Sequence, residues 1–122
     1  MTRMSKPENL AFLVCAGTSG QIVGVINLTS VVLGVFRSGY LGYYAFSGFE
    51  RQGFMRKGLR AVVRHAFNKL KLHRLEANIQ PGNFASIALV KACGFTHEGY
   101  SPRYLKIGGR WRDHERWAIL AP

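Results

Sequence analysis

The 122 residues include 17 Lys and Arg against six Asp and Glu, a formal net charge of +11, and 48% of them are hydrophobic. This length and apolar content are typical of one globular domain, residues 1–122, and exclude a disordered chain. The longest apolar stretches are broken by Gly, Asn, Thr and Ser, and the first residues lack a contiguous apolar core. We therefore expect neither a transmembrane helix nor a secretory leader, but a soluble cytoplasmic protein without a membrane partner.

The excess of positive charge has two interpretations. A basic surface attracts polyanions, which include a ribosome, RNA or a phosphate-bearing cofactor. The same charge also fits a small basic protein that carries it for solubility alone. The two cysteines and four histidines show no metal-ligand spacing, so we expect no metal site.

The first half of the sequence predicts three strands. Residues 10–16, 21–33 and 40–46 are rich in apolar, β-branched and aromatic residues. Glycine-containing turn signals separate them at residues 17–20 and 37–39. This arrangement predicts an antiparallel meander.

The second half predicts two helices and three strands. Apolar residues recur at helical spacing from Met55 to Leu70, with basic residues on the other face. Alternation over residues 75–80 predicts a strand. Asn83 is a suitable N-cap for a second helix that runs to about Ala92, and Gly94 stands where a C-terminal cap glycine belongs.

Two closing strands complete the predicted fold. Residues 95–107 and 110–120 alternate, and Gly108 and Gly109 form a tight turn between them. The predicted order is β-β-β-α-β-α-β-β. Because strands stand on both sides of the helices, we expect an α/β fold with a mixed, mostly antiparallel sheet flanked by helices, not a doubly wound parallel sheet.

The first candidate site is the junction at residues 49–57, just before the first helix. A helix N-terminus offers unpaired backbone N–H groups and a partial positive charge to phosphate oxygens. Gly53 would allow close approach to the backbone, and Arg51, Arg56 and Lys57 add positive charge. The alternative interpretation is a plain glycine turn.

Three further segments contain candidate side chains. Asn83 and Ser86 stand three residues apart at the mouth of the second helix, as ligand-binding groups or as a simple cap. Glu98 is either a general base or a solvated strand residue. Asp113 and His114 are adjacent on a strand and point to opposite faces, so we expect no catalytic dyad.

Taken in order, these segments resemble the GNAT superfamily of acetyltransferases from about residue 20 to the end. Residues 50–55 occupy the place of its [Q/R]-x-x-G-x-[G/A] motif, with Glu50 and Met55 as departures. The run NFAS at 83–86 is similar to its N-x-x-S, and is followed by the usual Gly94-Phe95. Residues 94–100 and 108–114 closely resemble the Rim-type ribosomal-protein-alanine acetyltransferases.

The resemblance implies a set of site residues and a co-substrate, acetyl-CoA. The end of a splayed strand, Tyr44, Ala45 and Phe46, would pair with the pantetheine arm. The backbone amides of Arg51, Gln52, Gly53, Phe54 and Met55 would hold the pyrophosphate. Asn83 would bind the cofactor arm, and Ser86 would act as an acid toward the leaving thiolate. Beside these two residues, Glu98 stays the candidate base from the residues alone.

The resemblance implies an N-acetyltransferase in which an amine attacks the thioester directly. Its implied substrate is the N-terminal alanine of a ribosomal protein. Two alternatives stay open: a non-catalytic GNAT that acts as a basic ribosome- or RNA-associated module, and a GNAT acting on a small-molecule amine. The family's first strand and two helices have no counterpart in the predicted order, so we expect an N-terminally shortened domain whose exposed sheet edge favours a homodimer.

Overall fold

The computed structural model describes residues 2–6, 9–16, 20–46 and 53–122. Its elements, in chain order, are β1 (Thr2–Lys6), β2 (Asn9–Cys15), β3 (Ile22–Val32), β4 (Ser38–Ala45), α1 (Phe54–Asn68), β5 (Arg74–Ile79), α2 (Phe84–Ala92), β6 (Thr96–Ile107) and β7 (Arg110–Leu120). The predicted order is correct from β2 onward but lacks β1. The polar run TRMSK shows no apolar alternation, and β1 pairs antiparallel with β2 at the edge that we expected to be open.

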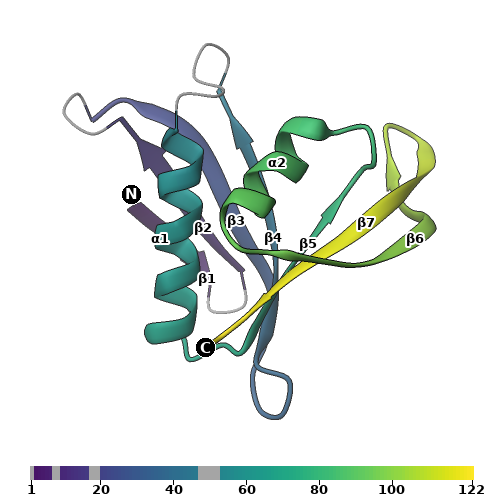
Figure 1. The fold of residues 1–122 in the computed structure, drawn as a ribbon. Helices are drawn as coiled ribbons and strands as arrows, with labels where there is room; N and C mark the ends of the chain where they lie inside the picture. Colours follow the sequence, from purple (N-terminus) through teal and green to yellow (C-terminus); the bar gives the residue numbers. More distant parts are fainter. Residues whose placement is uncertain (1, 7–8, 17–19, 47–52) are drawn as a thin grey trace.

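Seven strands form one sheet in the order β1-β2-β3-β4-β5-β7-β6. All neighbouring strands are antiparallel except β4 and β5, which are parallel. This confirms the mixed, mostly antiparallel sheet. In Figure 1, α1 lies against β2 and β3, and α2 stands between the diverging ends of β4 and β5. Among the described residues, no helix is both long and apolar enough to span a membrane.

The predicted helix ends agree with the structure. Asn83 is the N-cap of α2, and its side chain accepts a hydrogen bond from the backbone N–H of Ser86. Gly94 follows the C-terminus of α2 with a φ of 91°, a backbone conformation that glycine adopts without strain. Gly108 and Gly109 also have positive φ, as a tight hairpin turn requires.

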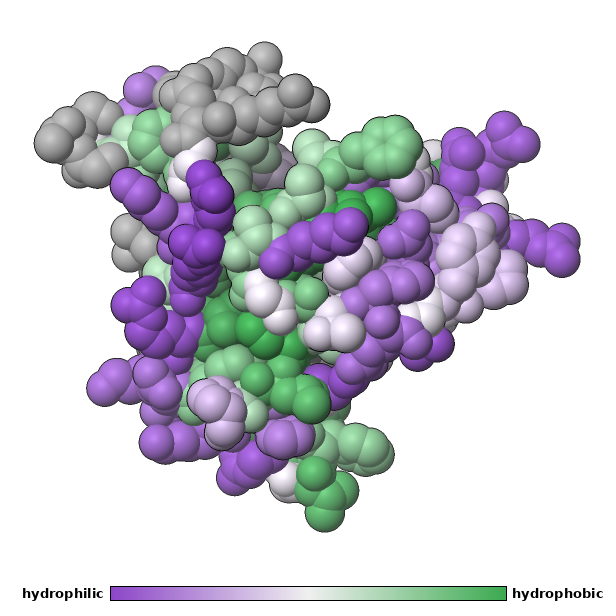
Figure 2. Space-filling view, viewed as in Figure 1, coloured by the Kyte–Doolittle hydropathy of each residue, from purple (hydrophilic) through white to green (hydrophobic). Residues whose placement is uncertain are grey.

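The core lies between α1 and the sheet. On β2, the alternate residues Leu10, Phe12 and Val14 are buried, as expected for a strand with one face on the core. The helix packs closely at Gly58, where an added Cβ would lie 2.8 Å from a methyl carbon of Val14. Figure 2 shows hydrophilic side chains along the outer face of α1 and a hydrophobic band between α1 and α2.

The feature that shapes the site is the divergence of β4 and β5. Their parallel pairing covers Ser38 to Leu41 on β4 and Arg74 to Ala77 on β5, and then stops. β4 nevertheless continues to Ala45, paired with β3 on its other side. Within the described residues, the last part of β4 therefore has one backbone edge without a strand partner, beside α2 (Figure 1).

Candidate active site

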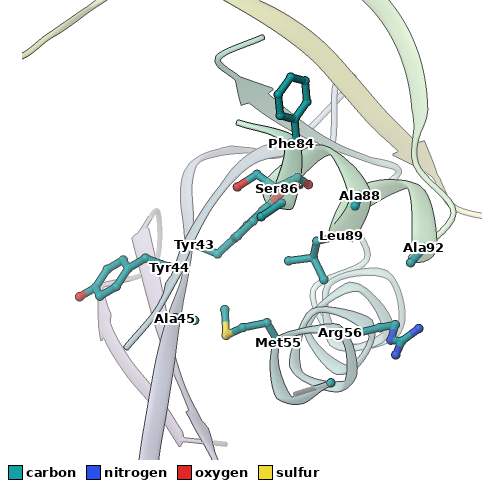
Figure 3. A pocket seen from close by; sticks show the side chains of 12 residues that line it. Tyr43, Tyr44, Ala45, Met55, Arg56, Phe84, Ser86, Ala88, Leu89 and Ala92 are labelled. Atoms are coloured by element: carbon teal, nitrogen blue, oxygen red, sulfur yellow. Dashed lines mark hydrogen bonds between the residues drawn. The ribbon is translucent and has the colours of Figure 1, made fainter. Parts of the chain in front are cut away.

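A cavity of about 600 Å³ opens where β4 and β5 diverge. Its walls are the end of β4, the first turn of α1 and one face of α2, as Figure 3 shows. The side chains and backbone that line it are Tyr43, Tyr44, Ala45, Gly53, Met55, Arg56, Phe84, Ala85, Ser86, Ala88, Leu89 and Ala92. Of the predicted cofactor residues, the structure brings Tyr44, Ala45, Gly53, Met55 and Ser86 into this one cavity.

The wall formed by α2 is apolar and exposed. The sequence of this helix, FASIALVKA, is hydrophobic on most of its circumference, which is typical of a helix buried on all sides. Yet Val90 is its one fully buried residue, and the Phe84 side chain is 77% exposed. The cavity therefore presents an uncovered apolar surface suited to an alkyl-rich ligand segment.

The wall formed by α1 suits an anion. Gly53 is the N-cap, with a φ of 82°, no side-chain cap and no acidic residue in the first turn. No atom of the described residues lies within 4 Å of the point where a Cβ would be attached, so these residues leave room for a ligand beside Gly53. Arg56 lines the same cavity and adds a positive charge. Glu50, Arg51 and Gln52, which we also expected at this junction, lie outside the described residues.

The third wall is the unpaired edge of β4. Tyr44 and Ala45 pair with Val25 and Gly24 of β3, which leaves the opposite edge available to an extended ligand. Phe46 is not part of the cavity lining, and its N–H donates to the carbonyl of Val23. Phe54 packs against the hydrophobic core instead of lining the cavity.

Tyr43 was not singled out from the sequence, yet it links β4 to α2. Its hydroxyl donates a 3.0 Å hydrogen bond to the carbonyl oxygen of Ser86 across the gap between the two elements. Burial raises the pKa of Tyr43 well above its ordinary value, so the phenol keeps its proton at neutral pH. In sequence it is one of several tyrosines in a strand pattern, and no local signal marks it.

A second, smaller cavity of about 240 Å³ adjoins the first. Both cavities are lined by Tyr43 and Ser86, so these two residues form the boundary between them. Asn83 lines the smaller cavity, with its side-chain oxygen engaged in capping α2. Asn78 and His114 line it as well. The sequence had marked His114 but not Asn78.

The predicted absence of an Asp113–His114 dyad is confirmed. Asp113 accepts hydrogen bonds from the Tyr100 hydroxyl and from the backbone N–H of Arg103. His114 is 3% exposed, and its Nδ1 lies 3.0 Å from the carbonyl oxygen of Arg112. The two side chains are thus held by different partners. No group of three His, Cys, Asp or Glu side chains in the described part of the chain could bind a metal ion.

Glu98 lies outside both cavities. Its two carboxylate oxygens accept hydrogen bonds of 2.6 and 3.0 Å from the guanidinium of Arg74, which also bonds Glu76. The hydrogen bond from Arg74 lowers the pKa of Glu98. A carboxylate held in this way is a weak base, and the structure does not bring it to Ser86.

Comparison with known proteins gives two informative relatives. The chain is 33% identical over 120 residues to the probable N-acetyltransferase YjcK of Bacillus subtilis, covering 98% of this chain and 66% of that protein. It is 39% identical over 102 residues to the [ribosomal protein uS5]-alanine N-acetyltransferase of Escherichia coli, covering 84% of this chain and 53% of that protein. The chain thus spans about half to two thirds of the length of these relatives.

Solved structures share the same fold. The ribosomal-protein-S5-alanine acetyltransferase of Vibrio fischeri superposes with a TM-score of 0.86 at 28% identity, covering 93% of this chain and 62% of that one. RimJ of Mycobacterium smegmatis, solved in complex with CoA-disulfide, superposes with a TM-score of 0.87 at 35% identity. The match covers 93% of this chain and 54% of that one. Residues 1–96 match the family described as acetyltransferase (GNAT) domain. These findings confirm the resemblance found in the motifs: the chain belongs to the GNAT acetyltransferase family.

Proposed function

We propose that this chain is the catalytic part of an acetyl-CoA-dependent N-acetyltransferase whose acceptor is the N-terminal alanine of a ribosomal protein. The observation that carries the proposal is the composition of the 600 Å³ cavity. An open helix N-terminus, a free strand edge and an apolar helix face line it side by side. These three surfaces match the pyrophosphate, the amides and the alkyl groups of coenzyme A.

The described residues offer groups suited to three parts of this co-substrate: the pyrophosphate, the pantetheine amides and the alkyl segments. The N-terminus of α1 at Gly53, with Arg56 beside it, is suited to the pyrophosphate. We assign the backbone amides of residues 51–55 to this group, of which residues 53–55 are described. The free edge at Tyr44 and Ala45 offers N–H and C=O groups to the pantetheine amides. Leu89 of α2 contributes apolar contact.

Acetyl-CoA supplies an acetyl group activated as a thioester, and the chain binds and orients it. Backbone N–H groups at the end of β4 are suited to polarise the thioester carbonyl. We assign to the hydroxyl of Ser86, which lies at the boundary of the two cavities, the role of proton donor to the leaving thiolate. Among the described residues that line these two cavities there is neither Cys15 nor Cys93, and burial raises the pKa of Cys93. Direct attack by the amine therefore fits better than a covalent enzyme intermediate.

The acceptor is proposed from the smaller cavity and from the relatives. Its volume of about 240 Å³ is below the roughly 300–1,000 Å³ of pockets for drug-sized ligands, which favours a small terminal residue. Its described lining contains no carboxylate, whereas a polyamine would require acidic partners. The E. coli relative at 39% identity acts on the alanine of uS5, and a net charge of +11 suits a ribosomal substrate.

The test is a transfer assay with mass-spectrometric detection. The purified chain, acetyl-CoA and a synthetic uS5 peptide with a free N-terminal alanine are expected to give one added acetyl group and one equivalent of free thiol. The same peptide with a blocked N-terminus is the control. Absence of transfer together with RNA binding that weakens steeply with added salt would identify the non-catalytic module instead. Transfer to spermidine but not to the peptide would identify a small-amine acetyltransferase.

A further inference from the structure

We propose that the smaller cavity binds the acceptor amine and that Nε2 of His114 removes its proton. This inference rests on the proposed function and assigns the acceptor side of the reaction to particular atoms. It starts from the boundary formed by Tyr43 and Ser86, which line both cavities. A thioester held in the larger cavity and an amine held in the smaller one would meet at this boundary.

His114 provides the observation that carries this assignment. Its Nδ1 is 3.0 Å from the carbonyl oxygen of Arg112. Since a carbonyl only accepts, Nδ1 carries the hydrogen, and the lone pair of the neutral ring is on Nε2. Among the described residues that line the smaller cavity, His114 is the one that carries an imidazole, the side chain that serves most often as a general base.

The groups around His114 leave this assignment intact. On β7, Arg112 lies two residues before His114. Asp113, directly before His114, accepts hydrogen bonds from the Tyr100 hydroxyl and the backbone N–H of Arg103. From β6, the ring of Tyr104 meets the imidazole edge-on, with centroids 6.3 Å apart. From β4, Tyr43 faces the cavity as a protonated phenol, and the described cavity residues of β5 carry no charge.

Bonds and protons balance in the proposed transfer. The lone pair of the neutral amine attacks the thioester carbonyl carbon, and the new C–N bond forms while the N–H proton passes to Nε2 of His114. The C–S bond then breaks, and the departing sulfur takes the proton of the Ser86 hydroxyl. Release of the proton from His114 and return of one to Ser86, both through water, restore the starting state. The sum is amine plus thioester giving amide plus thiol.

Two histidine variants test the base. His114→Asn keeps a donor at the position of Nδ1 and deletes Nε2, whereas His114→Gln keeps a polar, non-basic atom near Nε2. Both are expected to lower kcat by about 10²–10⁴-fold while acetyl-CoA still binds, as loss of general-base catalysis predicts. His73→Asn, which changes an exposed histidine outside both cavities, is the matched control and keeps the wild-type rate.

The pH profile gives a readout that a purely structural role would not change. At acidic pH, log kcat/KM of the wild-type chain toward the alanine peptide rises with a slope of two, because both the amine and His114 must be unprotonated. The His114→Asn profile is expected to rise with a slope of one, from the amine alone. A folded His114→Asn variant that keeps more than a third of the wild-type rate and the slope of two overturns the assignment.

The pH profile of the wild-type chain remains informative if neither histidine variant folds. A wild-type slope of one would leave the amine as the only group that must lose a proton, and it overturns the assignment of His114. If the wild-type chain binds acetyl-CoA but acetylates neither peptide nor free amines, the proposed function itself fails and this inference with it.

Discussion

Gly24 of β3 is a position where a single added methyl group disturbs the walls of the larger cavity. An added Cβ would lie 2.5 Å from the Met55 sulfur and 2.8 Å from the carbonyl oxygen of Tyr44, and both residues line the cavity. The Met55 side chain can rotate away, but the Tyr44 carbonyl belongs to the backbone of β4. Relief of that contact therefore requires β4 to move.

The expected cost of Gly24→Ala is that of overpacking a well-packed site, about 1–3 kcal/mol in the free energy of unfolding. For a chain of this size, this corresponds to a melting temperature lower by about 3–15 °C. Because the end of β4 is displaced, we also expect acetyl-CoA to bind at least tenfold more weakly. Thermal denaturation and isothermal titration measure the two effects.

Gly42→Ala is the matched control, because it adds the same methyl group on the neighbouring strand. Nothing lies within 4 Å of its Cβ position, so neither stability nor acetyl-CoA affinity should fall. If Gly24→Ala melts and binds like Gly42→Ala, then β4 does not approach β3 as closely as the structure shows, and the reasoning fails. Loss of stability without loss of binding would refute the link between this contact and the cavity.

Four further predictions concern Gly53, Asn83 and the Glu98–Arg74 ion pair. Gly53→Ala forces a left-handed backbone on alanine, so we expect a loss of about 1–2 kcal/mol in stability and weaker acetyl-CoA binding; unchanged binding would show that the N-terminus of α1 is not the anion site. Asn83→Ala should cost about 0.5–2 kcal/mol in urea denaturation and Asn83→Asp much less, because the side chain caps α2; equal losses would contradict the capping role. Glu98→Gln should leave kcat within about threefold, since Arg74 holds this carboxylate away from both cavities, and a loss above a hundredfold would restore it as the base. Because the folded-state pKa of Glu98 is lowered, its ion pair stabilises the fold above the ordinary carboxyl pKa, about 4.3, and this contribution disappears as pH falls through the lowered value. The stability difference between the wild type and Arg74→Met, measured by urea denaturation from pH 3 to 7, should therefore shrink in acid, and a difference that is constant with pH would contradict the ion pair.

The sequence predicted the elements that carry a clear apolar pattern, either a continuous apolar run or a regular spacing of apolar residues. The β2, β3 and β4 strands were found from apolar and β-branched runs, α1 from its apolar face, and the ends of α2 from Asn83 and Gly94. The first strand, β1, was missed because its residues carry no pattern, and its place in the sheet comes from backbone pairing with β2. Local pattern therefore predicts an element only where burial imposes one.

The site was less predictable because it depends on contacts between distant parts of the chain. Two parts of the site have local sequence signals. Gly53 is itself a glycine just before a predicted helix, and Ser86 follows three residues after the N-cap residue Asn83. Tyr43 stands in an ordinary strand, and its place between the two cavities comes from the end of the β4–β5 pairing, which no local pattern encodes. From the sequence, Glu98 was either a general base or a solvated strand residue. In the folded sheet Arg74 of β5 donates hydrogen bonds to it, and this contact depends on the strand order.

The central claim is that the cavity between β4, α1 and α2 binds acetyl-CoA. Isothermal titration of the purified chain with acetyl-CoA, first at low and then at moderate salt, tests it most directly. We expect acetyl-CoA to bind saturably at one site per chain, and we expect this binding to persist when salt is added. Apolar and backbone contacts supplement the charge of Arg56, so the affinity does not depend on charge alone. Absence of binding, or binding that vanishes as salt is raised, would contradict it and leave a basic surface that attracts anions without a formed cofactor site.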